Sequence, residues 1–163
     1  MKDTTLIIRR ICLPSRFIDS DIKMHLLNEI SKKVEEECTK DYGHILSVEK
    51  ITKIISHTIS RSNCDNVFIV EFKAITLKPE IGMGVSGTVC MVYKDGIFIN
   101  IFDKQKLLIP FSLMNDECKF DPINNMYFRK DKCIKVGDEL EAKITAIQFN
   151  NKSFSCIGMF KDL

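Results

Sequence analysis

The sequence lacks the features of a secreted, membrane-spanning or metal-binding protein. No apolar run approaches the roughly 20 residues that a membrane helix requires. The apolar stretch within the N-terminal residues MKDTTLIIRRICL is too short for a secretory signal. The seven cysteines form no CxxC pair, and no histidine stands at a zinc-ligand spacing from them. We therefore expect an intracellular protein with reduced thiols, most of them small buried residues, and with no membrane contact, metal or cofactor.

A strong net charge is also missing. The 24 Lys and Arg residues against 22 Asp and Glu leave a net charge of +2, divided evenly between residues 1–80 and 81–163. Since non-specific affinity for nucleic acid grows with the number of phosphates neutralised, binding to RNA or DNA would have to come from a local patch. The length of 163 residues and the apolar content of 45% allow one ordinary domain or two small ones.

The first half of the chain predicts a small α+β domain. Residues 4–12 are rich in strand formers and end at Leu13-Pro14, where proline cannot continue a strand. From residue 19 to about 38, apolar residues recur at spacings of three and four, which predicts a helix that the short polar residues 19–21 can cap. Residues 44–56 show mixed alternation and residues 67–78 alternate with a period of two, so both are expected to be strands. The predicted domain is one helix on a small antiparallel sheet.

The second half predicts an all-β barrel. Strands are expected at 84–93, 97–103, 106–111, 139–149 and 153–159, with turn signals such as Gly137-Asp138 between them. The stretch 115–136 is expected to be mainly loop and can hold an extra strand at 126–129. Five strands with a long insertion after the third are typical of the OB fold, a scaffold that holds single-stranded nucleic acid against a strand face. We therefore expect two domains, 1–79 and 80–163.

Five segments, in this order and at these spacings, carry a resemblance that covers nearly the whole chain. They are CTKDYGHILSV (38–48), FKAITLKPEIGMGVSGTV (72–89), DGIFINI (95–101), KFDP (119–122) and SFSCIGMFKDL (153–163). Together they resemble the larger subunit of the RNA polymerase stalk, a family that includes the seventh subunit of eukaryotic RNA polymerase II and its archaeal counterpart. The resemblance implies an N-terminal tip domain that docks on the polymerase core beside the clamp, followed by an OB barrel that faces nascent RNA.

The resemblance also implies a function. The chain would be a non-catalytic stalk subunit of a multisubunit DNA-directed RNA polymerase, active in transcription initiation. Its partners would be the large polymerase subunits, a small stalk subunit if one is present and, weakly, nascent single-stranded RNA. A cellular subunit of this kind would be nuclear, whereas a large DNA virus would keep it in the virion and the host cytoplasm. The alternative is a free-standing factor that binds single-stranded RNA in translation or RNA metabolism through the same barrel.

The chain departs from the family pattern at three places. The segment SHTISRSNCDN has no glycine, where relatives often carry a glycine-rich loop between the second and third tip strands. Asp95 stands before the turn glycine, where RNA-binding barrels of this type commonly place an aromatic residue. Residues 108–110 occupy the neighbourhood of a histidine that is frequent on the third barrel strand.

The RNA-binding candidates are aromatic and basic residues near the predicted strand ends of the barrel. Phe98 can stack on a base if its strand face is open, but its alternation with Ile97 and Ile99 equally allows it to pack inside the barrel. The basic candidates can contact phosphates or belong to a solvated surface. The full set of candidates is Tyr93, Lys94, Phe98, Lys104, Lys106, Arg129 and Lys130.

The candidates for docking on the polymerase core lie, by resemblance, at turns of the tip domain. They are Tyr42, Gly43, Ile59, Ser60 and Arg61, although Gly43 can equally mark a turn that needs permissive backbone angles. No catalytic arrangement is expected. The three histidines are isolated in the sequence, residues 35–37 are consecutive glutamates that point in different directions on a helix, and GMGVSG lacks the Lys-Ser/Thr pair of a phosphate-binding loop.

Overall fold

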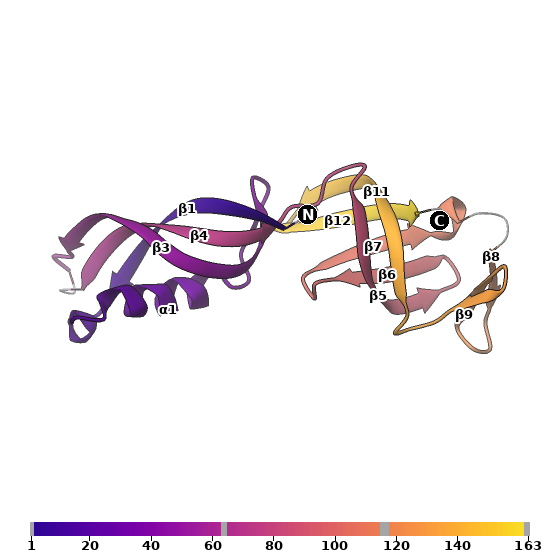
Figure 1. Cartoon of the computed structure of the whole chain (residues 1–163), viewed down its shortest axis with the longest axis horizontal. Helices are drawn as coiled ribbons and strands as arrows, with labels where there is room; N and C mark the ends of the chain where they lie inside the picture. The colour runs from indigo at the N-terminus through magenta and orange to yellow at the C-terminus, as the bar shows by residue number, and fades with distance from the viewer. Residues whose placement is uncertain (1, 63–64, 115–117, 162–163) are drawn as a thin grey trace. The chain divides into compact units, whose positions relative to one another are not determined.

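The computed structural model describes residues 2–62, 65–114 and 118–161 and divides into two compact units, Lys2–Lys78 and Pro79–Leu163 (Figure 1). We call the first unit the tip domain and the second the barrel domain. No helix in the described part of the chain is long and apolar enough to cross a membrane. The elements of the tip domain are β1 (Lys2–Leu13), the short 3₁₀ helix η1 (Ser15–Phe17), α1 (Ile22–Val34), β2 (Cys38–Thr39), β3 (Gly43–Ile59) and β4 (Asn66–Leu77).

The tip domain is a four-stranded antiparallel sheet with α1 packed on one face (Figure 1). The strand order is β1-β4-β3-β2, so β4 lies in the middle and its inward residues alternate with a period of two. The two-residue strand β2 was not expected from the sequence. The core of the domain is formed by apolar residues of the sheet and helix, chiefly Ile7, Ile11, Leu26, Ile30, Val34, Phe68, Val70 and Phe72.

Helix α1 is shorter than the sequence predicts, and its start differs in detail. It ends at Val34, so Glu35 and Glu36 follow the helix instead of continuing it. Asp21 occupies the N-cap position but its side chain makes no capping hydrogen bond. The carboxylate of Asp19 instead accepts a hydrogen bond from the backbone N–H of Asp21 at 2.8 Å, which orders the turn before the helix.

Strand β3 has an unusual register. Its 17 residues pair with the 12 residues of β4, and the register shifts four times along the pairing. The shifts recur every third residue, so the side chains that face α1 are also three residues apart: Ile45, Val48, Ile51 and Ile54. Repeated β-bulges increase the twist of a strand, and here they keep β3 wrapped around the helix.

The barrel domain is a closed five-stranded barrel. Its strands are β5 (Gly84–Tyr93), β6 (Gly96–Ile101), β7 (Gln105–Pro110), β11 (Glu139–Asn150) and β12 (Ser153–Phe160). They close in the order β11-β12-β7-β6-β5, with β12 parallel to β7 and the other pairs antiparallel. The interior is filled by alternate apolar residues, among them Val89, Ile97, Ile99, Ile101, Leu107, Ile109 and Ile144.

The segment between β7 and β11 is more ordered than predicted. After the short helix η2 (Phe111–Leu113) it forms a separate three-stranded antiparallel sheet of β8 (Cys118–Asp121), β9 (Met126–Arg129) and β10 (Lys132–Ile134). The expectation that 115–136 is mainly loop is therefore wrong, although the extra strand at 126–129 is present. Residues 115–117 of that stretch lie outside the described residues. We call β8–β10 the inserted sheet.

The predicted fold class is confirmed. An α+β unit with one helix on a small antiparallel sheet is followed by an OB-type barrel, and the five barrel strands begin and end within two residues of their predicted bounds.

Candidate functional site

Phe98 lies on the outside of the barrel. Its neighbours on β6, Ile97 and Ile99, are fully buried, whereas Phe98 is only half-buried. Because side chains alternate between the two faces of a strand, the isoleucines fill the interior and the Phe98 ring faces outward. Of the two arrangements that the sequence allowed, the structure has the outward one.

Tyr93 lies beside Phe98 on the same face. It pairs with Gly96 across β5 and β6, and Phe98 is two residues further along β6. The two rings meet edge to face, with centroids 6.2 Å apart and planes at 89°. Tyr93 is 53% exposed, and its hydroxyl contacts the sulfur of Met91 at 3.2 Å. The pair forms an exposed aromatic surface on which a base can stack.

Three lysines frame this aromatic pair. Lys106 pairs with Asn100 across β6 and β7, and Asn100 is two residues from Phe98, so Lys106 belongs to the same face. Lys94 lies in the β5–β6 turn and Lys104 in the β6–β7 turn, at the two ends of β6, and all three lysines are exposed. We call this surface the aromatic face: Tyr93, Lys94, Phe98, Lys104 and Lys106.

Arg129 and Lys130 belong to a different surface. They lie where β9 turns into β10, on the inserted sheet. The Arg129 guanidinium lies 4.9 Å from the centroid of the Phe160 ring on β12, so it packs the inserted sheet against the barrel. Lys130 is exposed and adopts a left-handed turn conformation with φ of 53°. Arg129 thus has a structural contact that its sequence context did not indicate.

Tyr127 positions the aromatic face and was missed by the sequence analysis. Its side chain is fully buried, and its hydroxyl lies 2.7 Å from the backbone carbonyl oxygens of both Tyr93 and Lys94. Burial, together with the negative charge of Asp95, raises the pKa of Tyr127, so the hydroxyl keeps its proton and remains a donor. The Phe120 ring packs against it at 5.1 Å between centroids. Tyr127 lies in the extra strand that the sequence allowed at 126–129, but nothing in the sequence indicated which backbone groups its hydroxyl would reach.

The tip candidates divide into two groups at opposite ends of β3. Gly43 begins β3, is buried and has φ of +75°; a Cβ there would lie 2.1 Å from the carbonyl oxygen of Leu77. Only glycine fits this position, so the turn alone accounts for a glycine at residue 43, and no docking role is needed to explain it. Ile59 ends the same strand, and the intervening pairs separate the two ends by on the order of 30 Å. One compact docking surface does not contain both groups.

Ile59, Ser60 and Arg61 lie at the β3–β4 turn, which we call the distal end. Ile59 is 66% exposed and Arg61 is also exposed. The turn is tied to the segment after β1 through Asn66. Its Oδ1 accepts a hydrogen bond from His57 Nε2 at 2.7 Å, and its Nδ2 donates to the Ser15 hydroxyl at 3.3 Å. Ile18, in that segment, is exposed as well and was not among the candidates.

Tyr42 is part of a polar cluster inside the tip domain. Its hydroxyl donates a hydrogen bond to Glu37 at 2.6 Å, and the Arg9 guanidinium bonds both Glu37 and Tyr42. Burial opposes ionisation of Glu37, but the hydrogen bonds and charge of Arg9 outweigh it and hold the pKa of Glu37 below its usual value. The cluster fastens the chain after α1 to β1, so Tyr42 and Glu37 have structural roles.

Histidines and cysteines that were not candidates serve local structure. His25 bonds the Asp19 carboxylate at 3.1 Å, and His57 stacks on the Phe68 ring at 4.3 Å. Burial raises the pKa of the Cys38 and Cys156 thiols to about 11, so both are unreactive at neutral pH. Among the described residues no group of three or more His, Cys, Asp and Glu is placed to hold a metal ion.

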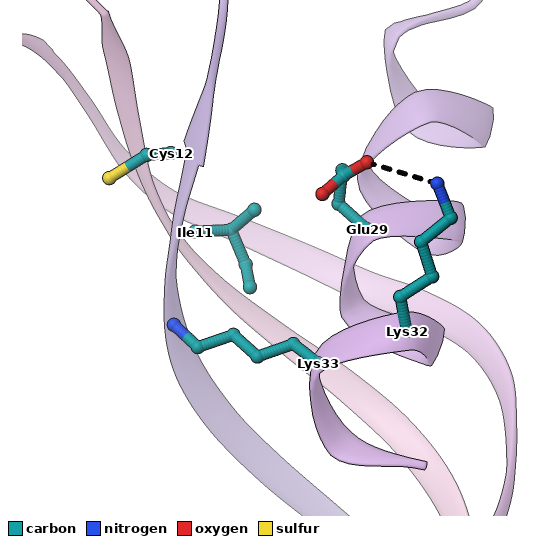
Figure 2. A pocket seen from close by; sticks show the side chains of 5 residues that line it. All are labelled: Ile11, Cys12, Glu29, Lys32 and Lys33. Carbon is teal, nitrogen blue, oxygen red and sulfur yellow. Dashed lines mark hydrogen bonds and ion pairs between the residues drawn. The ribbon is translucent and has the colours of Figure 1, made fainter.

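A shallow hollow of about 350 Å³ lies between α1 and the edge strand β1 (Figure 2). Its charged side chains already have partners: Lys32 pairs with Glu29 at 3.5 Å, and the Lys33 Nζ donates to the backbone carbonyl of Arg10 at 2.9 Å. Figure 2 shows the Cys12 sulfur pointing away from the helix. The lining offers no nucleophile beside a base.

Comparisons with known proteins agree with this architecture. Residues 78–156 match the family model described as the S1 RNA binding domain. The chain is 26% identical over 123 residues to DNA-directed RNA polymerase subunit Rpo7 of Saccharolobus solfataricus, covering 74% of this chain and 68% of that subunit. It is 25% identical over 166 residues to DNA-directed RNA polymerase II subunit RPB7 of Saccharomyces cerevisiae, a match that covers 99% of this chain and 95% of that subunit.

Among solved structures, the apo form of Mycoplasma genitalium RNase R matches with a TM-score of 0.40 and 26% identity. That match covers 48% of this chain and only 13% of the RNase R chain. The predicted resemblance to the polymerase subunits is confirmed by the relatives that match most of the chain.

Proposed function

Because this chain is related along most of its length to RNA polymerase subunits of the Rpo7 and RPB7 type, we propose that it is a non-catalytic stalk subunit of a multisubunit DNA-directed RNA polymerase. It anchors to the polymerase core by its tip domain and presents its barrel to nascent RNA. The observation that carries the proposal is that the similarity to RPB7 runs through both domains, and not through the S1 barrel alone.

The distal end of the tip domain is the docking surface in this proposal. Ile59 and Ile18 expose apolar area there, and Arg61 adds a positive charge. Exposed apolar side chains ringed by polar ones are typical of surfaces that a partner covers. Large polymerase subunits are the expected partners, with a small stalk subunit as a second one.

The aromatic face is the RNA-binding surface in this proposal. The outward Phe98 ring stacks on a base, Tyr93 supports it from the side, and the lysines at the ends of β6 and on β7 meet phosphates. Since these are few charges in a chain of net charge +2, the affinity for RNA is expected to be modest and to fall with salt. A cellular subunit of this kind works in the nucleus, whereas a viral one would work in the virion and the host cytoplasm.

Purification of the tagged chain from its native source tests the docking part. The wild type should recover large polymerase subunits, and Ile59→Asp should lose most of that recovery because a charge replaces an apolar contact. Ile123→Asp is the matched control. It makes the same change at a side chain that is 88% exposed on the barrel domain, outside the proposed docking surface, so this variant should still recover the polymerase. Recovery of the wild type as a lone RNA-binding monomer would instead support the free-standing factor.

Fluorescence anisotropy with a short single-stranded RNA tests the RNA part. Phe98→Ala should weaken binding by about fivefold or more, because one stacked base contributes about 1–3 kcal/mol. Phe98→Tyr keeps an aromatic ring and should bind like the wild type. Equal affinity of the Ala, Tyr and wild-type proteins would remove the aromatic face from the proposal.

A further inference from the structure

We propose that the outer face of the inserted sheet is a second platform for single-stranded RNA, with the Phe128 ring as the stacking surface and Lys119 as a phosphate contact. This inference rests on the RNA-binding part of the proposed function and extends it to a surface outside the five barrel strands.

The register of the inserted sheet places the two residues together. Phe128 on β9 pairs with Lys119 on β8 and with Cys133 on β10, so the three side chains form one row across the sheet. All three are exposed, and Phe128 is 44% exposed. The neighbours of the ring are therefore a long cationic side chain on one side and a small side chain on the other, which leaves the ring surface open.

The opposite face of the same sheet does the packing. Tyr127 is fully buried against the barrel, Ile134 is buried beside it, and Arg129 lies over the Phe160 ring. Phe128, in contrast, stacks on no other aromatic ring among the described residues. The fold of the inserted sheet is thus secured from its inner face, and packing does not account for an exposed phenylalanine on the outer one.

The charge around Phe128 favours nucleic acid over protein. Residues 118–134 contain four basic and two acidic residues, a net charge of +2 that equals that of the whole chain. Lys130 and Lys132 flank Asp131 at the β9–β10 turn, at the same end of the sheet as Lys119, and Lys132 pairs with Arg129 on the packed face. The carboxylate of Asp121, at the far end, is bonded within its own loop to Asn124 at 2.7 Å. Lysine is depleted at protein interfaces, whereas lysine beside an exposed aromatic ring suits single-stranded nucleic acid.

The inserted sheet meets the turn that carries the aromatic face through its inner face. The Tyr127 hydroxyl of the inserted sheet is bonded to the backbone of Tyr93 and Lys94, which begin the β5–β6 turn. A strand of RNA that passes Tyr93 therefore reaches the border of the inserted sheet within the same domain. Sites on OB folds range from about 4 to 16 nucleotides, so a long RNA can occupy both surfaces and a short one only the first.

Anisotropy titrations of the full chain with fluorescein-labelled single-stranded RNAs of about 5 and about 16 nucleotides test this inference. Phe128→Leu removes the aromatic ring but keeps an apolar side chain, and it should weaken binding of the long RNA by about fivefold or more. Binding of the short RNA should change by less than about twofold, since it stacks on Phe98. Phe128→Tyr should bind both RNAs like the wild type.

The lysine is tested through the salt dependence of the same titrations. Lys119→Ala should lower the slope of log K against log salt by about 0.7 for the long RNA, because one phosphate contact is lost. Lys23→Ala, which removes an exposed charge from α1 in the tip domain, is the control and should leave the slope unchanged. Thermal unfolding followed by circular dichroism checks that each variant is folded.

Three outcomes would overturn the inference. If Phe128→Leu and Lys119→Ala bind the long RNA like the wild type while Phe98→Ala does not, the aromatic face is the RNA site and the proposed function stands without the second platform. If Phe128→Leu leaves RNA binding intact but loses polymerase subunits in the purification, the platform docks a protein. If the wild type binds neither RNA, the RNA part of the proposed function fails together with this inference.

Discussion

The hydroxyl of Tyr127 is expected to hold the β5–β6 turn in place, and Tyr127→Phe removes it with almost no change in shape. The hydroxyl lies 2.7 Å from two backbone carbonyls, and its single proton can be donated to either of them. Phenylalanine would fill the same fully buried position but leave both carbonyls without this donor. The variant therefore isolates one partly buried hydrogen bond.

The expected loss of stability follows from the partial burial of that bond. The Tyr127 ring is buried but the two carbonyls belong to exposed residues that water can reach, so the loss is the net contribution of one hydrogen bond, about 0.5–1.5 kcal/mol. In a unit the size of the barrel domain, a loss near 1 kcal/mol lowers the melting temperature by about 4–8 °C. The displaced turn carries Tyr93 and Lys94, so RNA binding should weaken as well.

Tyr93→Phe is the matched control, because it makes the same chemical change at an exposed site. The Tyr93 hydroxyl contacts only the weak acceptor sulfur of Met91 among the described residues, so its loss should change stability by less than about 0.5 kcal/mol. Thermal unfolding by circular dichroism measures both variants, and amide hydrogen exchange reports the β5–β6 turn directly. If Tyr127→Phe melts at the same temperature as Tyr93→Phe, and the turn exchanges no faster, the hydroxyl does not support the aromatic face.

Two further predictions concern stability. Gly87→Ala on β5 should destabilise the barrel by about 1–3 kcal/mol, because the added Cβ would lie 2.5 Å from a backbone carbonyl oxygen of β6. Gly84→Ala on the same strand is the control. Its added Cβ would meet nothing within 4 Å, so denaturant titrations should find it neutral or stabilising. The pKa of Glu37 is lowered in the folded protein by its bonds to Arg9 and Tyr42. The ionised Glu37 therefore stabilises the fold fully at a pH above its ordinary pKa of 4.5, and this stabilisation is lost as the pH falls through the lowered pKa. Glu37→Gln should therefore flatten the acid side of the curve of stability against pH, and an unchanged acid limb would contradict this.

The regular parts of the fold were predictable because their apolar residues repeat with a single period along each element. The barrel strands alternate inward and outward over six to twelve residues, which is enough to place them. Two strands of the inserted sheet, β8 and β10, were missed, and they have only four and three residues. So few positions carry too little alternation to be distinguished from a loop containing Pro122 and two asparagines.

Strand β3 shows a different limit of pattern analysis. Its inward residues recur every third position, a spacing that neither an ideal strand nor an ideal helix has. The β-branched residues along it favoured a strand, but the mixed pattern hid which of them face the core. A bulge at every third residue explains why every third side chain faces the core. These side chains pack against α1, and such a tertiary contact cannot be read from the local sequence.

The candidate sites could be predicted as residue types but not as surfaces. Ile97, Phe98 and Ile99 are all apolar, so their alternation could not say which side faces the interior until the barrel closed. Tyr42 and Ile59 both lie at turns, and the length of β3 between them determines that they cannot share one surface. Distance along a strand and closure of a sheet, rather than residue type, settle these questions.

The aromatic face also accounts for the departure at Asp95. Gly96 cannot carry a side chain, because a Cβ would lie 2.6 Å from the carbonyl oxygen of Ile109. Tyr93 is paired directly with Gly96, so the space above the glycine is open for the tyrosine ring, which meets Phe98 edge to face. The aromatic ring that the resemblance led us to expect beside the turn glycine would thus come from Tyr93 on the neighbouring strand. In the proposed function, a base that stacks on Phe98 would still meet two aromatic rings.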